Sequence, residues 1–145
     1  MEGLEGYWKK RQGFVIGSKD DSINGCIVFE IAPFDGACIY EPICMQNGFP
    51  FEAVRNYDDR YKGELFCYIE RIHLAKEHRG EGIGNEMLED CIRIAKGEGV
   101  KGIFIIVSPE EEMSFSMEKW IASKGFSVIS RIDDDIPLMF LNIGE

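Results

Sequence analysis

Three glycines alternate with other residues in Arg79-Gly80-Glu81-Gly82-Ile83-Gly84, between an apolar strand-like run and an amphipathic helix. Because glycine has no side chain, the backbone N–H groups of such a loop can approach a ligand closely. The helix that follows adds amides without intrahelical partners and the positive end of its dipole. The segment therefore predicts a cradle for an anionic diphosphate, and it constrains the surrounding fold.

The segments on either side of this loop predict a strand–helix–strand unit. Residues 64–74 are rich in β-branched and aromatic side chains and predict a long strand. From Ile83 the apolar residues recur at helical spacing, and Gly97 and Gly99 mark the helix end. The apolar run 101–107 predicts a strand covered on both faces. A right-handed crossover makes the two strands parallel and places the glycine loop at the carboxyl end of the first.

The rest of the chain is predicted to consist of further strands and one helix. Ser108 fits the N-cap of that helix, which is expected to end at Gly125. The side chains that it is expected to bury are Met113, Met117, Trp120 and Ile121. Residues 43–60 give no clear pattern and stay unassigned. The further strands are expected at 13–17, 26–31, 37–40, 127–132 and 137–143, with turns at 20–25 and 133–135.

The composition indicates one acidic globular domain over residues 1–145. It has 26 acidic against 16 basic residues and a net charge of −10. Nucleic acid or an anionic membrane would be repelled over most of the surface, whereas a cationic amine suits this field. The five cysteines show no C-x-x-C pairing and predict neither disulfides nor a metal site. Without a signal-peptide core or a membrane-length apolar run, a cytoplasmic location is expected.

Two well-known nucleotide-binding loops do not fit the glycine spacing. A P-loop requires Gly-Lys-Ser/Thr, but Gly84 is followed by Asn85 and Glu86. A dinucleotide-binding fingerprint requires G-x-G-x-x-G, and its last position falls on Asn85 or Met87. Both kinds of nucleotide site are excluded.

The pattern R-G-x-G-x-G resembles the acyl-coenzyme A loop of the GNAT superfamily of N-acetyltransferases, Gln/Arg-x-x-Gly-x-Gly/Ala. The resemblance runs from about Glu64 to Phe126, nearly half of the chain. It implies an α/β (α+β) fold with a mixed, mostly antiparallel sheet. That sheet is split between two parallel central strands and has helices on both faces. The resemblance also implies acetyl-CoA as cosubstrate.

The resemblance implies site residues in the loop and in the strand before it. Glu70 occupies the position where several members place a general base, and Tyr68 precedes it by one strand repeat. Glu70 is expected to share a sheet face with Tyr68 and Ile72 unless a bulge intervenes. The alternative is a solvated strand carboxylate paired with Arg71 or a lysine. The coenzyme contacts implied are Ile72, His73, Leu74, Arg79, Gly80, Glu81, Gly82, Ile83, Gly84, Asn85, Ser108 and Ser114; in the family the backbone of the first three hydrogen-bonds the pantetheine arm and polarises the thioester.

The chain departs from the family pattern at the expected general acid. Many members carry a tyrosine where this sequence has Ile121, and an asparagine where it has Ser114. The candidates to replace that acid are Tyr68, Ser108, Ser114 and Tyr40. Solvent is a further candidate, because a thiol with a pKa near 8.5 is already a fair leaving group.

These features favour an N-acetyltransferase acting on a primary amine. No cysteine lies at a plausible nucleophile position, which favours direct attack in a ternary complex. The missing tyrosine keeps open a non-catalytic acyl-CoA sensor or protein-interaction domain. A third alternative is a small acidic interaction protein whose glycine loop is an ordinary surface turn. The acceptor, the acyl length and the choice between monomer and homodimer stay open.

Overall fold

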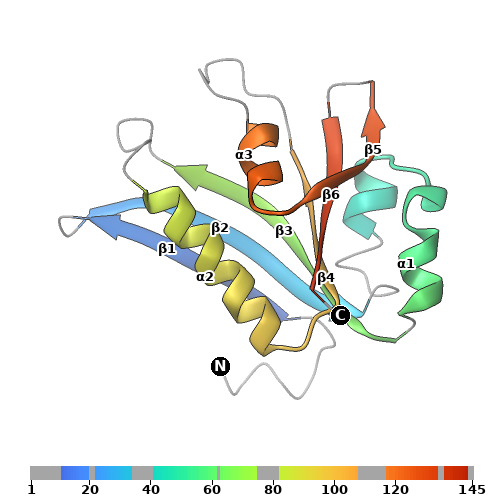
Figure 1. Cartoon of the computed structure of the whole chain (residues 1–145), viewed down its shortest axis with the longest axis horizontal. Coiled ribbons are helices and arrows are strands. Elements are labelled where there is room, and N and C mark those ends of the chain that lie inside the picture. The colour runs from blue at the N-terminus through green and yellow to red at the C-terminus, as the bar shows by residue number, and fades with distance from the viewer. Residues whose placement is uncertain are drawn as a thin grey trace.

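The computed structural model describes residues 11–19, 22–33, 41–61, 63–74, 82–107, 117–133 and 136–143. These residues form a six-stranded sheet with helices on both faces (Figure 1). The strands are β1 (Arg11–Lys19), β2 (Ser22–Pro33), β3 (Leu65–Leu74), β4 (Gly102–Ile106), β5 (Ser127–Ile132) and β6 (Ile136–Asn142). The helical segments are η2 (Glu41–Gln46), η3 (Phe51–Ala53), α1 (Arg55–Arg60), α2 (Ile83–Gly97) and α3 (Met117–Ser123).

The strand order is β1-β2-β3-β4-β6-β5, and the neighbouring strands β3 and β4 are parallel. The other neighbouring pairs are antiparallel. This arrangement confirms the expected mixed, mostly antiparallel sheet with a parallel central pair. The parallel pair follows from the strand–helix–strand unit, because a crossover helix returns the chain to the same end of the sheet.

The first core lies between the sheet and α2. Five apolar side chains of α2 are buried at helical spacing, and α2 packs over β1 and β2 (Figure 1). In β4, Ile103 and Ile105 belong to this core, whereas Phe104 belongs to a second core on the other face. The prediction of a strand covered on both faces is confirmed. The buried residues of α2 at this core are Ile83, Met87, Leu88, Cys91 and Ala95.

The second core lies under the helical segments between β2 and β3. The rings of Phe104 and Phe140 pack at a tilt with their centroids 4.8 Å apart, and the ring centroid of Tyr57 in α1 lies 4.4 Å from that of Phe140. Phe49 and Val54 are also buried there. Sequence periodicity missed these segments, because pieces of three to six residues are too short to show a 3.6-residue repeat. Packing against aromatic side chains stabilises them instead.

The hairpin of β1 and β2 corrects one expectation. The expected hairpin is confirmed, because β1 and β2 pair antiparallel, but the turn predicted over 20–25 is too long, since β2 already begins at Ser22, which pairs with Lys19. Asn24 is accommodated as an extra residue in β2, where the register shifts. The expected strand at 37–40 lies outside the described residues.

The expected carboxyl-terminal helix and strands are confirmed where the structure describes them, but Met117 and Trp120 are half-buried and only Ile121 of the described α3 residues is buried. The chain forms α3, turns at Gly125 with a φ of +102°, and continues into β5 and β6. The expected N-cap at Ser108 and the expected buried Met113 lie outside the described residues. Among the described residues, no helix combines the length and apolar character needed to cross a membrane.

Candidate active site

The parallel pair β3 and β4 separates part-way along its length. Paired residues run from Cys67 opposite Ile103 to Ile69 opposite Ile105, where the described pairing ends. On its other edge β3 stays paired with β2 as far as Leu74. The last residues of β3 therefore turn one edge of their backbone toward the split rather than toward a neighbouring strand in the described part of the chain.

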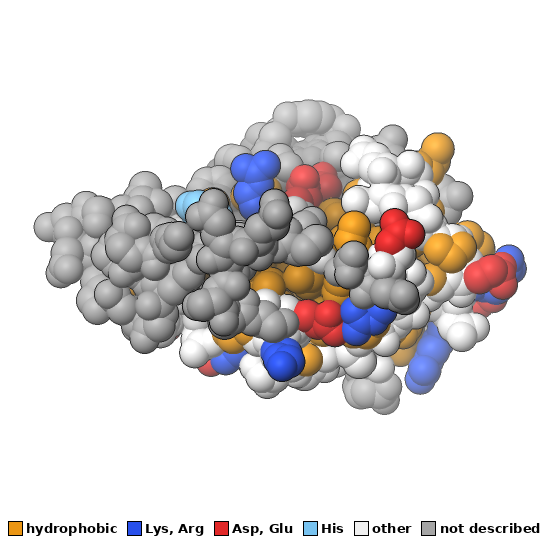
Figure 2. Space-filling model, turned by 90° about the horizontal axis from the view of Figure 1, so that it is seen from above, with side chains coloured by type: hydrophobic (Ala, Val, Ile, Leu, Met, Phe, Trp, Pro, Cys, Tyr) orange, Lys and Arg blue, Asp and Glu red, His pale blue; other side chains and the backbone are white. Residues whose placement is uncertain are grey.

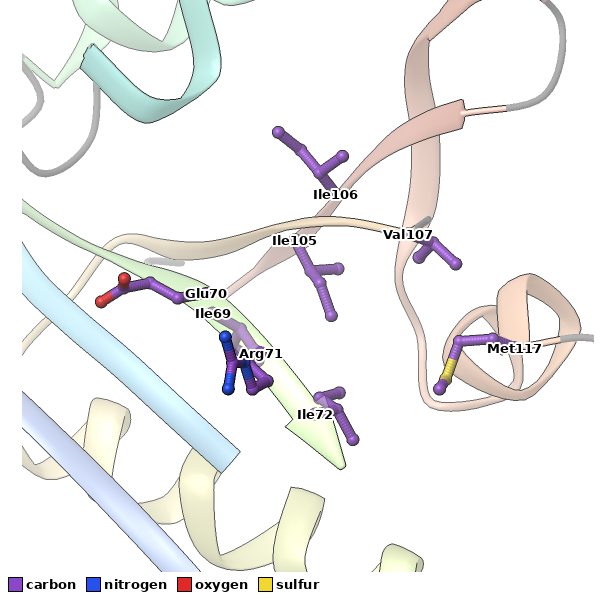
Figure 3. Close-up of a pocket in the computed structure, with 8 residues that line it drawn as sticks. All are labelled: Ile69, Glu70, Arg71, Ile72, Ile105, Ile106, Val107 and Met117. Carbon is purple, nitrogen blue, oxygen red and sulfur yellow. The ribbon is translucent and has the colours of Figure 1, made fainter. Parts of the chain in front are cut away.

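A cavity of about 240 Å³ lies at this split. Its walls come from β3, from β4 with the residue after it, and from α3 (Figure 3). Ile105 and Ile106 point to opposite sides of β4, and Met117 approaches from α3. Seen from above, this end of the molecule shows hydrophobic side chains between charged ones (Figure 2). The residues that line the cavity are Ile69, Glu70, Arg71, Ile72, Ile105, Ile106, Val107 and Met117.

Glu70 is the extra residue of a β-bulge at the start of the split. Val28 pairs with Arg71, and the next residue of β2, Phe29, pairs with Ile69. Glu70 therefore lies between two residues of β3 that face successive residues of β2. A bulge shifts the alternation of side chains by one residue. Ile69 and Ile72 consequently both pack toward the α2 core, while Tyr68 belongs to the α1 core. The expected shared face of Tyr68 and Ile72 is wrong, and the exposed Glu70 lies where that face changes.

Tyr68 lies beside two carboxylates on the α1 face of the sheet. It is 6% exposed and pairs across the strands with Glu30, which is also 6% exposed. Burial, followed by the negative charges of Glu70 and Glu30, raises the pKa of Tyr68 to about 12. The Tyr68 hydroxyl thus keeps its proton at neutral pH.

Glu30 is a residue that the sequence analysis missed. Among the described side chains it is the buried charged one. Burial of a charge is costly and occurs often at functional sites. The available signal was a single acidic residue inside the apolar run from Cys26 to Ile31.

The N-terminus of α2 lies just beyond the end of β3. Gly82 is its N-cap in a left-handed conformation with a φ of +87°, and a Cβ there would meet no atom within 4 Å. The Glu86 amide donates to the Gly82 carbonyl over 3.1 Å. The amides of Ile83, Gly84 and Asn85 precede this bond and have no carbonyl to bond within the helix. Amide donors at the N-terminus of a helix favour an anionic group.

The structure brings part of the predicted site together. Ile72, His73 and Leu74 form the end of β3, and the His73 side chain is exposed. Gly82 and Asn85 lie at the N-terminus of α2. Six predicted or candidate residues lie outside the described ones: Tyr40, Arg79, Gly80, Glu81, Ser108 and Ser114.

The sequence matches the model of the acetyltransferase (GNAT) family over residues 4–115. The chain belongs to this family. A comparison with proteins of curated function finds no match. Family membership supports an acyltransferase.

Solved structures share the fold at low sequence identity. An acetyltransferase from Bacillus cereus matches with a TM-score of 0.61 and 14% identity, over 97% of this chain and 80% of that one. PaiA N-acetyltransferase from Thermoplasma acidophilum, in complex with coenzyme A, matches with a TM-score of 0.57 and 16% identity. The match covers 91% of this chain and 61% of that one. A GNAT family acetyltransferase from Elizabethkingia anophelis with acetyl-CoA bound matches with a TM-score of 0.55 and 17% identity. The match covers 88% of this chain and 74% of that one.

The GNAT chain departs from the family pattern inside its core. Ile121, which stands where many members have a tyrosine, is fully buried in the α2 core. Its neighbour Trp120 is half-buried and donates an indole hydrogen bond to Asn85 over 2.8 Å. Position 121 therefore serves packing in this chain and supplies no proton.

Proposed function

We propose that this GNAT chain transfers the acetyl group of acetyl-CoA to a primary amine. The observation that carries the proposal is the split between β3 and β4, which opens next to the N-terminus of α2. An anionic diphosphate suits the helix end, and the cavity, lined by aliphatic side chains together with Glu70 and Arg71, suits a pantetheine arm with its acyl group. The coenzyme in the PaiA and Elizabethkingia structures supports this proposal.

The coenzyme contacts we propose follow the chain in two groups. The loop Arg79–Gly84 and Asn85 hold the diphosphate, with Ser108 and Ser114 as further contacts. The backbone of Ile72–Leu74 binds the pantetheine arm and donates toward the thioester oxygen. Donors aimed at an oxygen that gains negative charge lower the barrier directly.

Transfer proceeds in the proposal by direct attack within a ternary complex. The acceptor ammonium gives a proton to the Glu70 carboxylate, directly or through water, and becomes nucleophilic. Its nitrogen forms a bond to the acyl carbon and releases a second proton to solvent, the carbon–sulfur bond breaks, and the thiolate takes a proton from solvent. Transfer from Tyr68 to the thiolate is unfavourable, because its pKa of about 12 lies well above the usual 8.5 of a thiol. We assign Tyr68 the role of a neutral hydrogen-bond donor beside Glu70.

The acceptor class favoured is a cationic amine. The chain carries a net charge of −10, and Glu30 and Glu70 lie near the proposed point of attack. A negative field raises the local concentration of a cation. The charge bears on the class of acceptor and leaves its size open.

The test is thiol release from acetyl-CoA across a panel of primary amines and peptides, repeated with Glu70→Gln. For an accepted amine, Glu70→Gln is expected to lower kcat by about 10²- to 10⁴-fold, the usual contribution of a general base, while KM for acetyl-CoA stays constant. Glu64→Gln is the matched control, because Glu64 is an exposed carboxylate just before the opposite end of β3. Equal activity of both variants contradicts the role of Glu70.

The burial of Ile121 favours one other function, a non-catalytic acyl-CoA sensor. Calorimetry separates the possibilities. Tight coenzyme A binding without thiol release above hydrolysis, for every amine tried, identifies a sensor. The absence of coenzyme A binding removes both functions and leaves an acidic interaction protein.

A further inference from the structure

A hydrogen bond between helices joins α3 to the first turn of α2. Trp120 Nε1 donates to Asn85 Oδ1 over 2.8 Å, although 35 positions separate the two residues. Asn85 is the third residue of α2, and side chains of a helix lean toward its N-terminus. The carboxamide of Asn85 therefore lies at the end of α2 where the proposed diphosphate binds.

The indole determines which end of this carboxamide faces it. An indole N–H only donates, so the Asn85 oxygen turns toward Trp120 and the Nδ2 group turns away from it. The Nδ2 group carries two N–H donors. A phosphate oxygen requires donors, whereas the reversed carboxamide would present it with another acceptor. The Trp120 bond thus selects the orientation of Asn85 that suits an anion.

The helix that carries Trp120 is held at a second point. Arg131 of β5 donates to Glu118 through both Nη atoms, at 3.1 and 2.5 Å. Met117, one turn before Trp120, lines the cavity at the split, and both side chains pack against the α2 core. Figure 1 shows α3 beside the N-terminal end of α2 and the end of β3. Trp120 is therefore anchored between the phosphate end of α2 and the cavity wall.

We propose that Trp120 is a positioning residue for the coenzyme, resting on the function proposed above. Its N–H holds the Asn85 carboxamide with Nδ2 toward the diphosphate. Because Trp120 acts through Asn85, it raises the affinity for the coenzyme and does not change the rate of acetyl transfer.

The first test is Trp120→Phe, which keeps an aromatic ring and removes the N–H donor. Coenzyme A measured by calorimetry is expected to bind about 3- to 10-fold more weakly, the usual worth of one hydrogen bond. KM for S-acetylpantetheine, a thioester donor without the diphosphate, and kcat at saturating acetyl-CoA are expected to stay constant. Ser123→Ala is the matched control: it removes the Ser123 Oγ bond to the Trp120 carbonyl on the same helix and should leave coenzyme affinity constant.

The second test combines the substitution with Asn85→Leu, which removes the oriented carboxamide. If Trp120 acts through Asn85, Trp120→Phe causes no further loss of affinity in the Asn85→Leu background. A full additional loss there, or an equal rise of KM for both thioester donors, overturns the proposal. Unchanged affinity of Trp120→Phe while the native chain binds coenzyme A overturns this inference alone. Failure of the native chain to bind coenzyme A overturns the proposed function as well.

Discussion

At the scale of single residues, the bulge at Glu70 organises the site. One extra residue in β3 changes which side chains face each core, so Glu70 lies between the apolar split and the buried pair of Tyr68 and Glu30. Burial, together with the charges of the two carboxylates, raises the pKa of the Tyr68 phenol and keeps it neutral. A neutral donor beside a carboxylate can orient that carboxylate without competing for the acceptor's proton.

The raised pKa of Tyr68 predicts how stability changes at high pH. Well below pH 10 the phenol is protonated in both the folded and the unfolded chain and adds no pH dependence. Above about pH 10 the unfolded chain ionises first, because the folded pKa is about 12, and the contribution to stability is lost as pH rises. Between pH 9 and pH 11 the free energy of unfolding of the native chain should fall by about 1 kcal/mol more than that of Tyr68→Phe.

Urea unfolding of both proteins at pH 7, 9, 10 and 11 checks this prediction. The free energy of unfolding of the two should follow parallel courses between pH 7 and 9. Parallel courses up to pH 11 would contradict the raised pKa.

At the scale of elements, a glycine with a left-handed backbone conformation lies at each end of α2, and we expect only one of the two to affect coenzyme binding. Gly82 before the helix and Gly99 after it have φ values of +87° and +81°, and a Cβ added at either glycine would meet no atom within 4 Å. A side chain at either position costs strain and meets no clash. Only Gly82 adjoins the amides proposed to hold the diphosphate.

The two glycines predict a matched pair of variants. Gly82→Ala and Gly99→Ala should each lower the free energy of unfolding by about 1–2 kcal/mol, the cost of a left-handed L-residue. Gly82→Ala alone should weaken coenzyme A binding, because it adds a methyl group next to the amides proposed to hold the diphosphate. Thermal unfolding and calorimetry measure the two effects. Equal coenzyme affinity of the two variants would contradict the position of the diphosphate.

At the scale of the whole molecule, the acidic charge predicts a dependence on ionic strength. With a net charge of −10, the chain attracts a cationic acceptor over distances that salt screens, about 30 Å at 0.01 M but 3 Å at 1 M. At saturating acetyl-CoA, kcat/KM for an alkylammonium acceptor should fall as salt rises. An arylamine, which is uncharged at pH 7, serves as the control. The same salt response of both acceptors would contradict recognition of a cation by the field.

The sequence by itself determined the parts of this protein that depend on local pattern. The spacing of apolar residues predicted α2, β3 and β4, because each is long enough, or apolar enough, to show its period. The glycine spacing indicated the family, which the match over residues 4–115 confirmed. The departure at Ile121 was also visible in the sequence.

Only the tertiary structure decided what depends on neighbouring strands and helices. The bulge at Glu70 is a property of the register between β2 and β3, and it reversed the expected alternation. The helical segments before β3 exist because aromatic side chains of the sheet cover them, which no local pattern records. The burial of Glu30 and the bond from Trp120 to Asn85 likewise join residues far apart along the chain. Local periodicity reports which face of an element is apolar, whereas register and packing decide which side chains meet.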